Sequence, residues 1–293
     1  AKEKNVNFLF EASVGGGIPI LRPLHSSLTG DVVEEITGIL NGTTNYMLTK
    51  MFYEGANYDE VLKEAQDNGY AERNPEADVE GYDACRKIAI LASIISGKQV
   101  DFEDIYCEGI TKITADDMKY AKEMGMTIKL LATCKREGDK ICAMVSPCLL
   151  HKSHPLFNID GVFNSIFVHG NMLGDAMFYG SGAGKLPTAS AVVGDIVEEA
   201  KNPGRNLGVM WSEEKLELEG KEELKRRFFV RMKGSPEVVK GKLAADFGEI
   251  EFVNIEGMQG EFGFVTALMP EGEYEKKAVA YQSEIISMIR VEK

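Results

Sequence analysis

The sequence lacks the features that mark several classes of protein. No stretch of about eighteen consecutive apolar residues occurs, so no transmembrane helix is predicted. Basic residues are in deficit, with 33 Lys and Arg against 46 Asp and Glu. The resulting net charge of -13 argues against nucleic acid and anionic membranes as partners. The N-terminus lacks the apolar length and cleavage pattern of a signal peptide, which indicates a cytoplasmic protein.

Cysteine is also scarce, and its pattern is not that of a disulfide framework. The chain has five cysteines and no CxxC pair, for which reduced thiols in the cytosol are the simplest explanation. His151 and His154 form an HxxH, but no acid or cysteine at ligand spacing accompanies them. Satisfied or exposed histidines are therefore favoured over a metal site there.

The chain is long enough for about two domains, with 293 residues of which 44% are hydrophobic. The order of strand-like and helix-like segments in residues 1–207 predicts an α/β (α+β) fold with a mixed sheet covered by helices. The expected strands there are Val6–Val14, Ile36–Leu40, Thr127–Lys135, Ile141–Val145, Val162–His169 and Ala176–Tyr179. The expected helices are Asn45–Tyr53, Tyr58–Asp67, the apolar run that ends before Gly97, one that begins at Thr114, and Thr188–Lys201.

A second unit is predicted at residues 224–293, after a polar connecting segment at 208–223. Its segments follow the order strand, helix, strand, strand, helix, strand. This βαββαβ order is that of a ferredoxin-like domain. The fold alone does not indicate a function.

Three acids and a lysine gather in one short window before a buried helix. Glu72 and Asp78 precede Asp83 and Lys87, and the apolar run Ile88–Ile95 follows directly. Asp83 and Lys87 stand one helical turn apart and therefore share a face. Either they form a buried ion pair, or they belong to a reactive site in which desolvation prepares the lysine for proton transfer. The spacing alone leaves both possibilities open.

Two glycine clusters also have two interpretations each. The loop Gly180–Lys185 fails the Walker pattern, because Tyr179 replaces its first glycine and Leu186 its Ser or Thr. Its amides lie between a strand and a helix, so an anion contact and a plain tight turn are both open.

The loop from Glu11 to Ile18 contains three consecutive glycines. Backbone carbonyls and one carboxylate suit a hard cation. The residues alone favour the other interpretation, a strand end that needs positive φ.

Five segments in this order resemble homoserine dehydrogenases. They run from about Phe8 to Lys201, and their combination is far more specific than any one of them. The segments are EASVGGGIPI, GILNGTTNYML, GYAERNPEADVEGYDACRKIAILA, HPLFNIDGVFNSIFV and YGSGAGKLPTASAVVGDI. The residues from 224 onward are similar to the ACT domain that follows the catalytic domain in many of these enzymes.

The resemblance implies an oxidoreductase of threonine, methionine and isoleucine biosynthesis. Such an enzyme interconverts L-homoserine and L-aspartate 4-semialdehyde with NAD or NADP. By this resemblance Lys87 is the acid/base residue. The residues implied at the substrate are Glu72, Asp78, Asp83, Tyr70, Gly42 and Thr43. Those implied at the cofactor are Gly182, Ala183 and Gly184.

The resemblance also implies a cation, an effector and a partner. A sodium ion is expected at the residues Glu11, Val14, Gly16 and Ile18. A homodimer through the catalytic-domain sheet, and threonine as an effector of the ACT domain, are expected in the same way. These enzymes begin with a dinucleotide-binding domain, whereas no GxGxxG occurs in this sequence. The chain is therefore expected to be the catalytic and regulatory portion of such an enzyme.

An alternative belongs to another class of protein. A non-catalytic amino-acid-binding regulatory module would bind an amino acid without turning it over. The intact combination of Glu72, Asp78, Asp83 and Lys87 argues against it, because it indicates that the reactive site has not been long disused.

Overall fold

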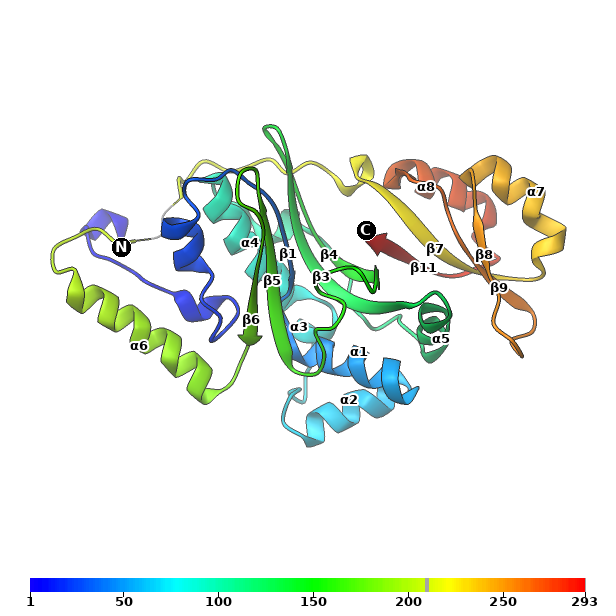
Figure 1. Ribbon diagram of the computed structural model, residues 1–293, viewed down its shortest axis with the longest axis horizontal. Helices are drawn as coiled ribbons and strands as arrows, with labels where there is room; N and C mark the ends of the chain where they lie inside the picture. The colour runs from blue at the N-terminus through cyan, green and yellow to red at the C-terminus, as the bar shows by residue number, and fades with distance from the viewer. Residues whose placement is uncertain (209–210, 293) are drawn as a thin grey trace.

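The computed structural model of the protein describes residues 1–208 and 211–292. It is an elongated molecule, with α6 at one end and α7 and α8 at the other (Figure 1). The predicted segments 208–223 and 224–293 include residues 209, 210 and 293, which lie outside the described residues. No helix in the described part of the chain is long and apolar enough to span a membrane.

One mixed sheet runs through the molecule in the order β6-β5-β1-β3-β4-β11-β7-β9-β8. Two short strands lie off this path: β2 pairs with β4, and β10 pairs with β7. The strands are β1 (Val33–Ile39), β2 (Tyr106–Cys107), β3 (Met126–Glu137), β4 (Lys140–His151), β5 (Phe163–Gly170), β6 (Gly174–Ser181), β7 (Lys225–Lys233), β8 (Glu251–Val253), β9 (Glu261–Val265), β10 (Met269–Pro270) and β11 (Ile285–Glu292). The helices are α1 (Gly42–Glu54), α2 (Tyr58–Asp67), α3 (Glu76–Val79), α4 (Tyr82–Ser96), α5 (Ala115–Glu123), α6 (Lys185–Lys201), α7 (Pro236–Phe247) and α8 (Glu271–Ala278). The prediction of a mixed sheet covered by helices is confirmed.

The β3–β4 hairpin forms the centre of the sheet. Its strands pair antiparallel along their whole length, and a turn at Gly138 with φ +62 joins them, as predicted. Both strands are buried over most of their length, and α4 packs against both of them. β4 continues past Pro147 to His151, beyond the predicted end at Val145. The proline is tolerated because β4 pairs with β2 before it and with β11 after it.

The first predicted strand, Val6–Val14, is wrong. The segment is irregular and contains a short 3-10 helix at Glu11–Ser13. Its alternating aromatic residues serve side-chain packing instead. The ring centroids of Phe8 and Phe10 lie 5.8 Å apart, and Phe10 contacts Trp211 edge-on at 6.3 Å. Val6 and Phe8 are 59% and 66% exposed, so the alternation here corresponds neither to strand pairing nor to burial of these side chains.

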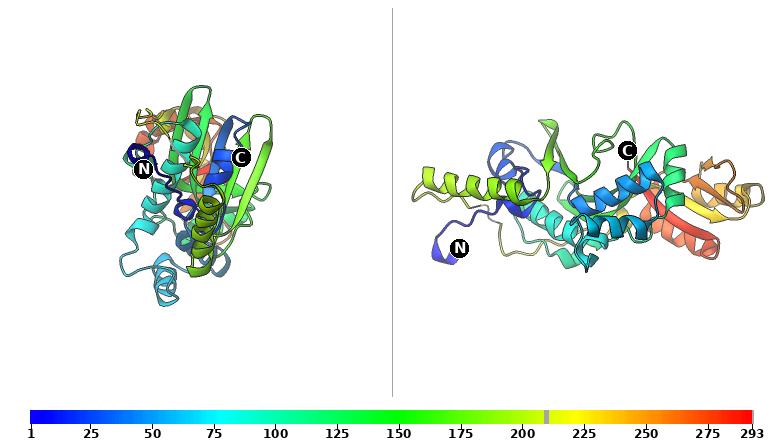
Figure 2. Two further views of the ribbon diagram at one scale, coloured as in Figure 1. Left: turned by 90° about the vertical axis from the view of Figure 1, so that its left-hand side faces the viewer. Right: turned by 90° about the horizontal axis from the view of Figure 1, so that it is seen from below.

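The C-terminal unit has the predicted order β7, α7, β8, β9, α8, β11. Its four main strands lie in the order β11-β7-β9-β8, and every neighbouring pair is antiparallel. This is the ferredoxin-like arrangement. β11 also pairs in parallel with β4, so the two sheets form one surface, which the sequence did not predict. Figure 2 shows the C-terminal helices at the opposite end from α6 and the N-terminal segment.

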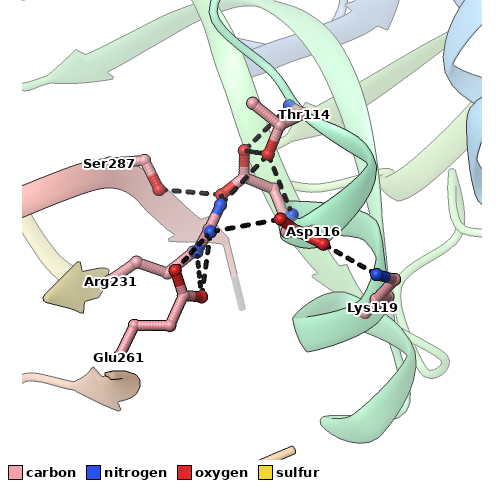
Figure 3. A network of polar contacts seen from close by, with 7 residues as sticks. Thr114, Asp116, Lys119, Arg231, Glu261 and Ser287 are labelled. Atoms are coloured by element: carbon pink, nitrogen blue, oxygen red, sulfur yellow. Dashed lines mark hydrogen bonds and ion pairs between the residues drawn. The ribbon is translucent and has the colours of Figure 1, made fainter. Parts of the chain in front are cut away.

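A buried polar network joins the two units (Figure 3). Arg231 on β7 donates to Asp117 of α5 at 2.8 Å and to Thr114 at 3.0 Å. On its other side, the guanidinium pairs with Glu261 of β9 at 2.9 Å. Ser287 of β11 donates to the same oxygen of Asp117 at 2.7 Å. Arg231 is 3% exposed and Asp117 is fully buried, so Asp117 depends on this guanidinium for compensation, whereas Arg231 is also paired with Glu261.

Arg231→Met is expected to lower the free energy of unfolding by about 3 kcal/mol or more, because it leaves Asp117 buried without its cation. The control is Arg227→Met on the same strand, whose partner Glu251 is largely exposed. That variant is expected to lose about 1 kcal/mol or less. Denaturant titration of both variants measures the difference in the free energy of unfolding. Equal small losses in the two variants would contradict a stabilising role for the buried Arg231–Asp117 pair.

Candidate active site

Lys87 is held at the start of α4 by two acceptors from different elements. Its Nζ donates to Asp83 Oδ2 at 2.6 Å, one helical turn away, and to the backbone oxygen of Leu40 at 2.8 Å. Leu40 follows β1 directly, so this bond ties α4 to the junction between β1 and α1. An ammonium has three hydrogens, and these two contacts leave one for a ligand. Asp83 and Lys87 share a face of α4, as predicted, and form an ion pair there.

Asn41 connects the acids to the helix that carries the other predicted residues. Its Nδ2 donates to Asp78 Oδ1 at 2.7 Å and to Asp83 Oδ2 at 3.0 Å. Its Oδ1 accepts the N–H of Thr44 at 2.9 Å, which caps α1. The bridge was not predicted from the sequence. Asp78 and Asp83 lie 37 and 42 positions away in the sequence, and no local pattern reports so distant a contact.

Asp78 is the acid whose charge is least compensated. Burial raises the pKa of its carboxyl, and the nearby charge of Asp83 raises this pKa further. The hydrogen bond from Asn41 opposes both effects without cancelling them, since the net direction is upward. Within residues 1–208 and 211–292, Asp78 forms no ion pair, whereas Asp83 is paired with Lys87. The negative charge of Asp78 is therefore available to pair with the positive charge of a ligand.

The N-terminus of α1 faces the same region. Gly42 and Thr43 begin the helix, and the first N–H groups of a helix have no acceptor within it. A side chain at Gly42 would come within 2.8 Å of the backbone oxygen of Val162, so the position needs glycine. The Thr43 hydroxyl donates to the backbone oxygen of Tyr70 at 2.7 Å. The N–H groups of this first turn are therefore directed at the same region as the acids and could donate a hydrogen bond to an anion.

Tyr70 and Glu72 lie on the loop that follows α2. Tyr70 is 46% exposed, and its ring lies 4.9 Å from that of Tyr46. Glu72 is exposed, and its backbone oxygen accepts a bond from Gln66 at 3.1 Å. The structure thus connects Asp78, Asp83 and Lys87 through Asn41. It joins Tyr70 to Thr43, whereas the exposed side chain of Glu72 forms no hydrogen bond or ion pair with the described residues.

The glycine loop after β6 is packed against the glycine loop near the N-terminus. A side-chain carbon at Gly16 would lie 2.3 Å from the backbone oxygen of Gly182, and one at Gly182 would lie 2.1 Å from Asn164. Gly184, with φ +112, then begins α6 without a side-chain cap. Asn164 is 1% exposed, and its carboxamide atoms have no hydrogen-bond partner among the described residues. The sequence predicted both loops but not their contact.

Glu11 caps the helical segment that begins at Leu21. Its Oε1 accepts the N–H groups of Ile20 at 2.5 Å and Leu21 at 2.8 Å, and its Oε2 accepts that of Arg22 at 2.8 Å. Gly15 and Gly16 have φ of +73 and +57, which confirms the expected need for positive φ. These three bonds leave acceptor capacity on Oε2, since a carboxylate has about four acceptor positions. Among the described residues, no three His, Cys, Asp or Glu side chains meet in a metal-binding group.

Comparison with known proteins gives a consistent family. A family model described as homoserine dehydrogenase matches residues 19–197. The homoserine dehydrogenase of Bacillus subtilis is 50% identical over 209 residues, which are 71% of this chain and 48% of the relative. That of Mycobacterium leprae is 46% identical over 262 residues, covering 86% of this chain and 59% of the relative. The chain spans about half the length of the curated relatives it matches.

Solved structures agree with this family. A crystal structure of a homoserine dehydrogenase from Thiobacillus denitrificans has a TM-score of 0.89 and 33% identity, covering all of this chain and 72% of that one. A hyperthermophilic archaeal homoserine dehydrogenase, solved in complex with NADPH, has a TM-score of 0.57 and 31% identity. It covers 69% of this chain and 59% of that one.

Asp78→Asn is expected to stabilise the protein at neutral pH. The raised pKa of Asp78 means that its ionisation is less favourable in the folded chain than in the unfolded chain. The stabilisation should appear as pH rises above the ordinary range of aspartate and vanish below it, where both states carry a protonated Asp78. Thermal unfolding at pH 7 should show a midpoint higher by roughly 2 °C or more. A lower midpoint for the variant at pH 7 would refute this account of Asp78.

Proposed function

This chain belongs to the homoserine dehydrogenase family, and from that premise we propose that it carries the substrate site of an enzyme that interconverts L-homoserine and L-aspartate 4-semialdehyde. The activity of the whole enzyme is part of the proposal, because the chain spans about half the length of its curated relatives. The observation that carries it is the position of Lys87. Its Nζ is bonded to Leu40 and Asp83, with one hydrogen left for substrate.

The site offers a separate partner for each polar group of homoserine. The carboxylate fits the free N–H groups of Gly42 and Thr43 at the start of α1. The ammonium fits Asp78, with the exposed Glu72 as a second carboxylate. The hydroxyl then reaches Lys87. An amino acid with a hydroxyl two carbons beyond its α-carbon matches this set of groups.

Lys87 is the residue proposed to move the proton. The nicotinamide, when bound, exchanges a hydride with C4 of the substrate. As the aldehyde is reduced, its oxygen gains negative charge and takes a proton from the Lys87 ammonium, which yields the alcohol. In the opposite direction Lys87, as the neutral amine, takes the hydroxyl proton. Asp83 and the carbonyl of Leu40 hold the ammonium in place for this transfer.

The residues around the glycine loop suit a cofactor contact. Gly182 has no room for a side chain, because its backbone packs directly against Asn164. The amides that follow, at Ala183, Gly184 and the start of α6, are those of an uncapped helix N-terminus and favour a negatively charged or polar group. We infer that NAD or NADP is contacted here by Gly182, Ala183 and Gly184.

A sodium ion is proposed beside the second glycine loop. Glu11 would provide its remaining acceptor position, and backbone carbonyls of Val14, Gly16 and Ile18 the others. Carbonyls and one carboxylate form a donor set that fits a hard cation. Exchange of Na⁺ for choline at constant ionic strength should lower the thermal unfolding midpoint. An unchanged midpoint would leave the loop with its capping role only.

The C-terminal unit is proposed to be an ACT-type regulatory domain that binds an amino acid such as threonine. Its ferredoxin-like strand order supports this assignment. A homodimer through the sheet is proposed on the basis of β6, which forms the edge of the sheet and exposes Met177 and Tyr179 at 48% and 54%. Sedimentation velocity tests the dimer, and a monomer at micromolar concentration would exclude it.

Lys87→Met is expected to reduce kcat by roughly 10²- to 10⁴-fold while L-homoserine still binds, because the variant keeps the alkyl chain but has no proton to exchange. The reaction is followed as homoserine-dependent reduction of NAD and NADP, on the chain alone and on a fusion with a dinucleotide-binding domain. Lys63→Met is the control, since Lys63 forms an exposed pair with Asp67 on α2. Amino-acid binding without turnover in either form would support the non-catalytic alternative.

A further inference from the structure

One neutral side chain, Asn41, stands between the two acids of the site. It is 6% exposed, and all of its polar hydrogens and its oxygen are engaged by Asp78, Asp83 and the N–H of Thr44. We propose that Asn41 is a positioning residue, which holds Asp78 ready for the substrate ammonium while Asp83 stays on Lys87. The inference rests on the proposed function and adds to it a residue that selects α-amino acids.

The orientation of the carboxamide is fixed from both ends. Its oxygen accepts the Thr44 N–H at 2.9 Å, so its NH₂ group must face the acids. A rotation by half a turn would set the amide oxygen against two carboxylates and lose the cap of α1. The two hydrogens therefore have one arrangement, with one on Asp78 and one on Asp83.

A neutral donor is the feature that leaves Asp78 attractive to a ligand. Asp83 already has the positive charge of Lys87 at 2.6 Å, whereas the hydrogen bond to Asp78 at 2.7 Å comes from the neutral amide of Asn41, and Lys87 acts on Asp78 only from beyond ion-pair distance. A lysine or arginine in place of Asn41 would neutralise Asp78 and remove the attraction for an incoming ammonium. The raised pKa of Asp78, caused first by burial, is consistent with an acid that lacks a cationic partner.

Asn41 also fixes where the two ends of an amino acid can lie. It immediately precedes Gly42 and Thr43, whose amides are the proposed carboxylate contact, and it bonds directly to Asp78, the proposed ammonium contact. An α-amino acid carries both groups on one carbon. One side chain thus links the proposed carboxylate contact to the proposed ammonium contact. We expect substitution of Asn41 to leave the affinity for ligands without an ammonium unchanged.

The test compares two ligands on the chain itself. Ligand-observed NMR titration gives the Kd of L-homoserine and that of 4-hydroxybutyrate, which lacks the ammonium. Asn41→Ser retains an N-cap but is too short to reach the acids. This variant is expected to raise the Kd of L-homoserine about tenfold or more, and that of 4-hydroxybutyrate by less than about twofold. Asn57→Ser, at the N-cap of α2, is the matched control and should change neither Kd.

A double variant separates positioning from a general structural loss. If Asn41 acts through Asp78, adding Asn41→Ser to Asp78→Asn should cause no further loss of homoserine affinity. Equal weakening of both ligands by Asn41→Ser, unchanged homoserine affinity, or an additive double variant would each overturn the proposal. A wild-type chain that binds neither ligand would instead refute the proposed function, so the two failures are distinguishable.

Discussion

The packing of α4 against the β3–β4 hairpin is the constraint on which the candidate site depends. Ile88 and Leu91 on the buried face of α4 are fully enclosed, and this fixes the helix in rotation and in height over the sheet. The first two turns of α4 are thereby placed beside the end of β1, where the carbonyl of Leu40 accepts a bond from Lys87. A charged pair at the head of a buried helix adds little stability, so its placement is better explained by chemistry than by folding.

The sheet extends the same constraint to the C-terminal unit. β4 carries α4 on one part of its length and pairs with β11 at its end, so the ferredoxin-like unit is continuous with the sheet beneath the site. Arg231, bonded to α5 and β9, and Arg290, paired with Glu271 at 2.5 Å and with Glu108 at 2.6 Å, join the units by buried charges rather than by a flexible linker.

Local signals determined how much of this could be predicted from the sequence. α2 was predicted with its observed bounds, Tyr58–Asp67, and the Asp83–Lys87 pair followed from helical spacing. The helix expected to begin at Thr114 is α5, whose N-cap is Thr114, whereas the helix expected from Asn45 begins three residues earlier, at Gly42. The bridge from Asn41 to the acids and the β4–β11 pairing join segments far apart in the chain, and single-sequence patterns carry no record of such contacts. Val6–Val14 alternates like a strand, but the segment is irregular and leaves Val6 and Phe8 exposed, so alternation alone did not determine its structure.

The central claim is that Lys87, Asp78 and the start of α1 together hold one amino acid with its hydroxyl at the lysine. A crystal structure of the chain with L-homoserine tests it most directly. The account predicts the hydroxyl within hydrogen-bond distance of Lys87 Nζ, the ammonium at Asp78 and the carboxylate at the amides of Gly42 and Thr43. Homoserine bound only in the ferredoxin-like unit, or bound here with its hydroxyl turned away from Lys87, would contradict it.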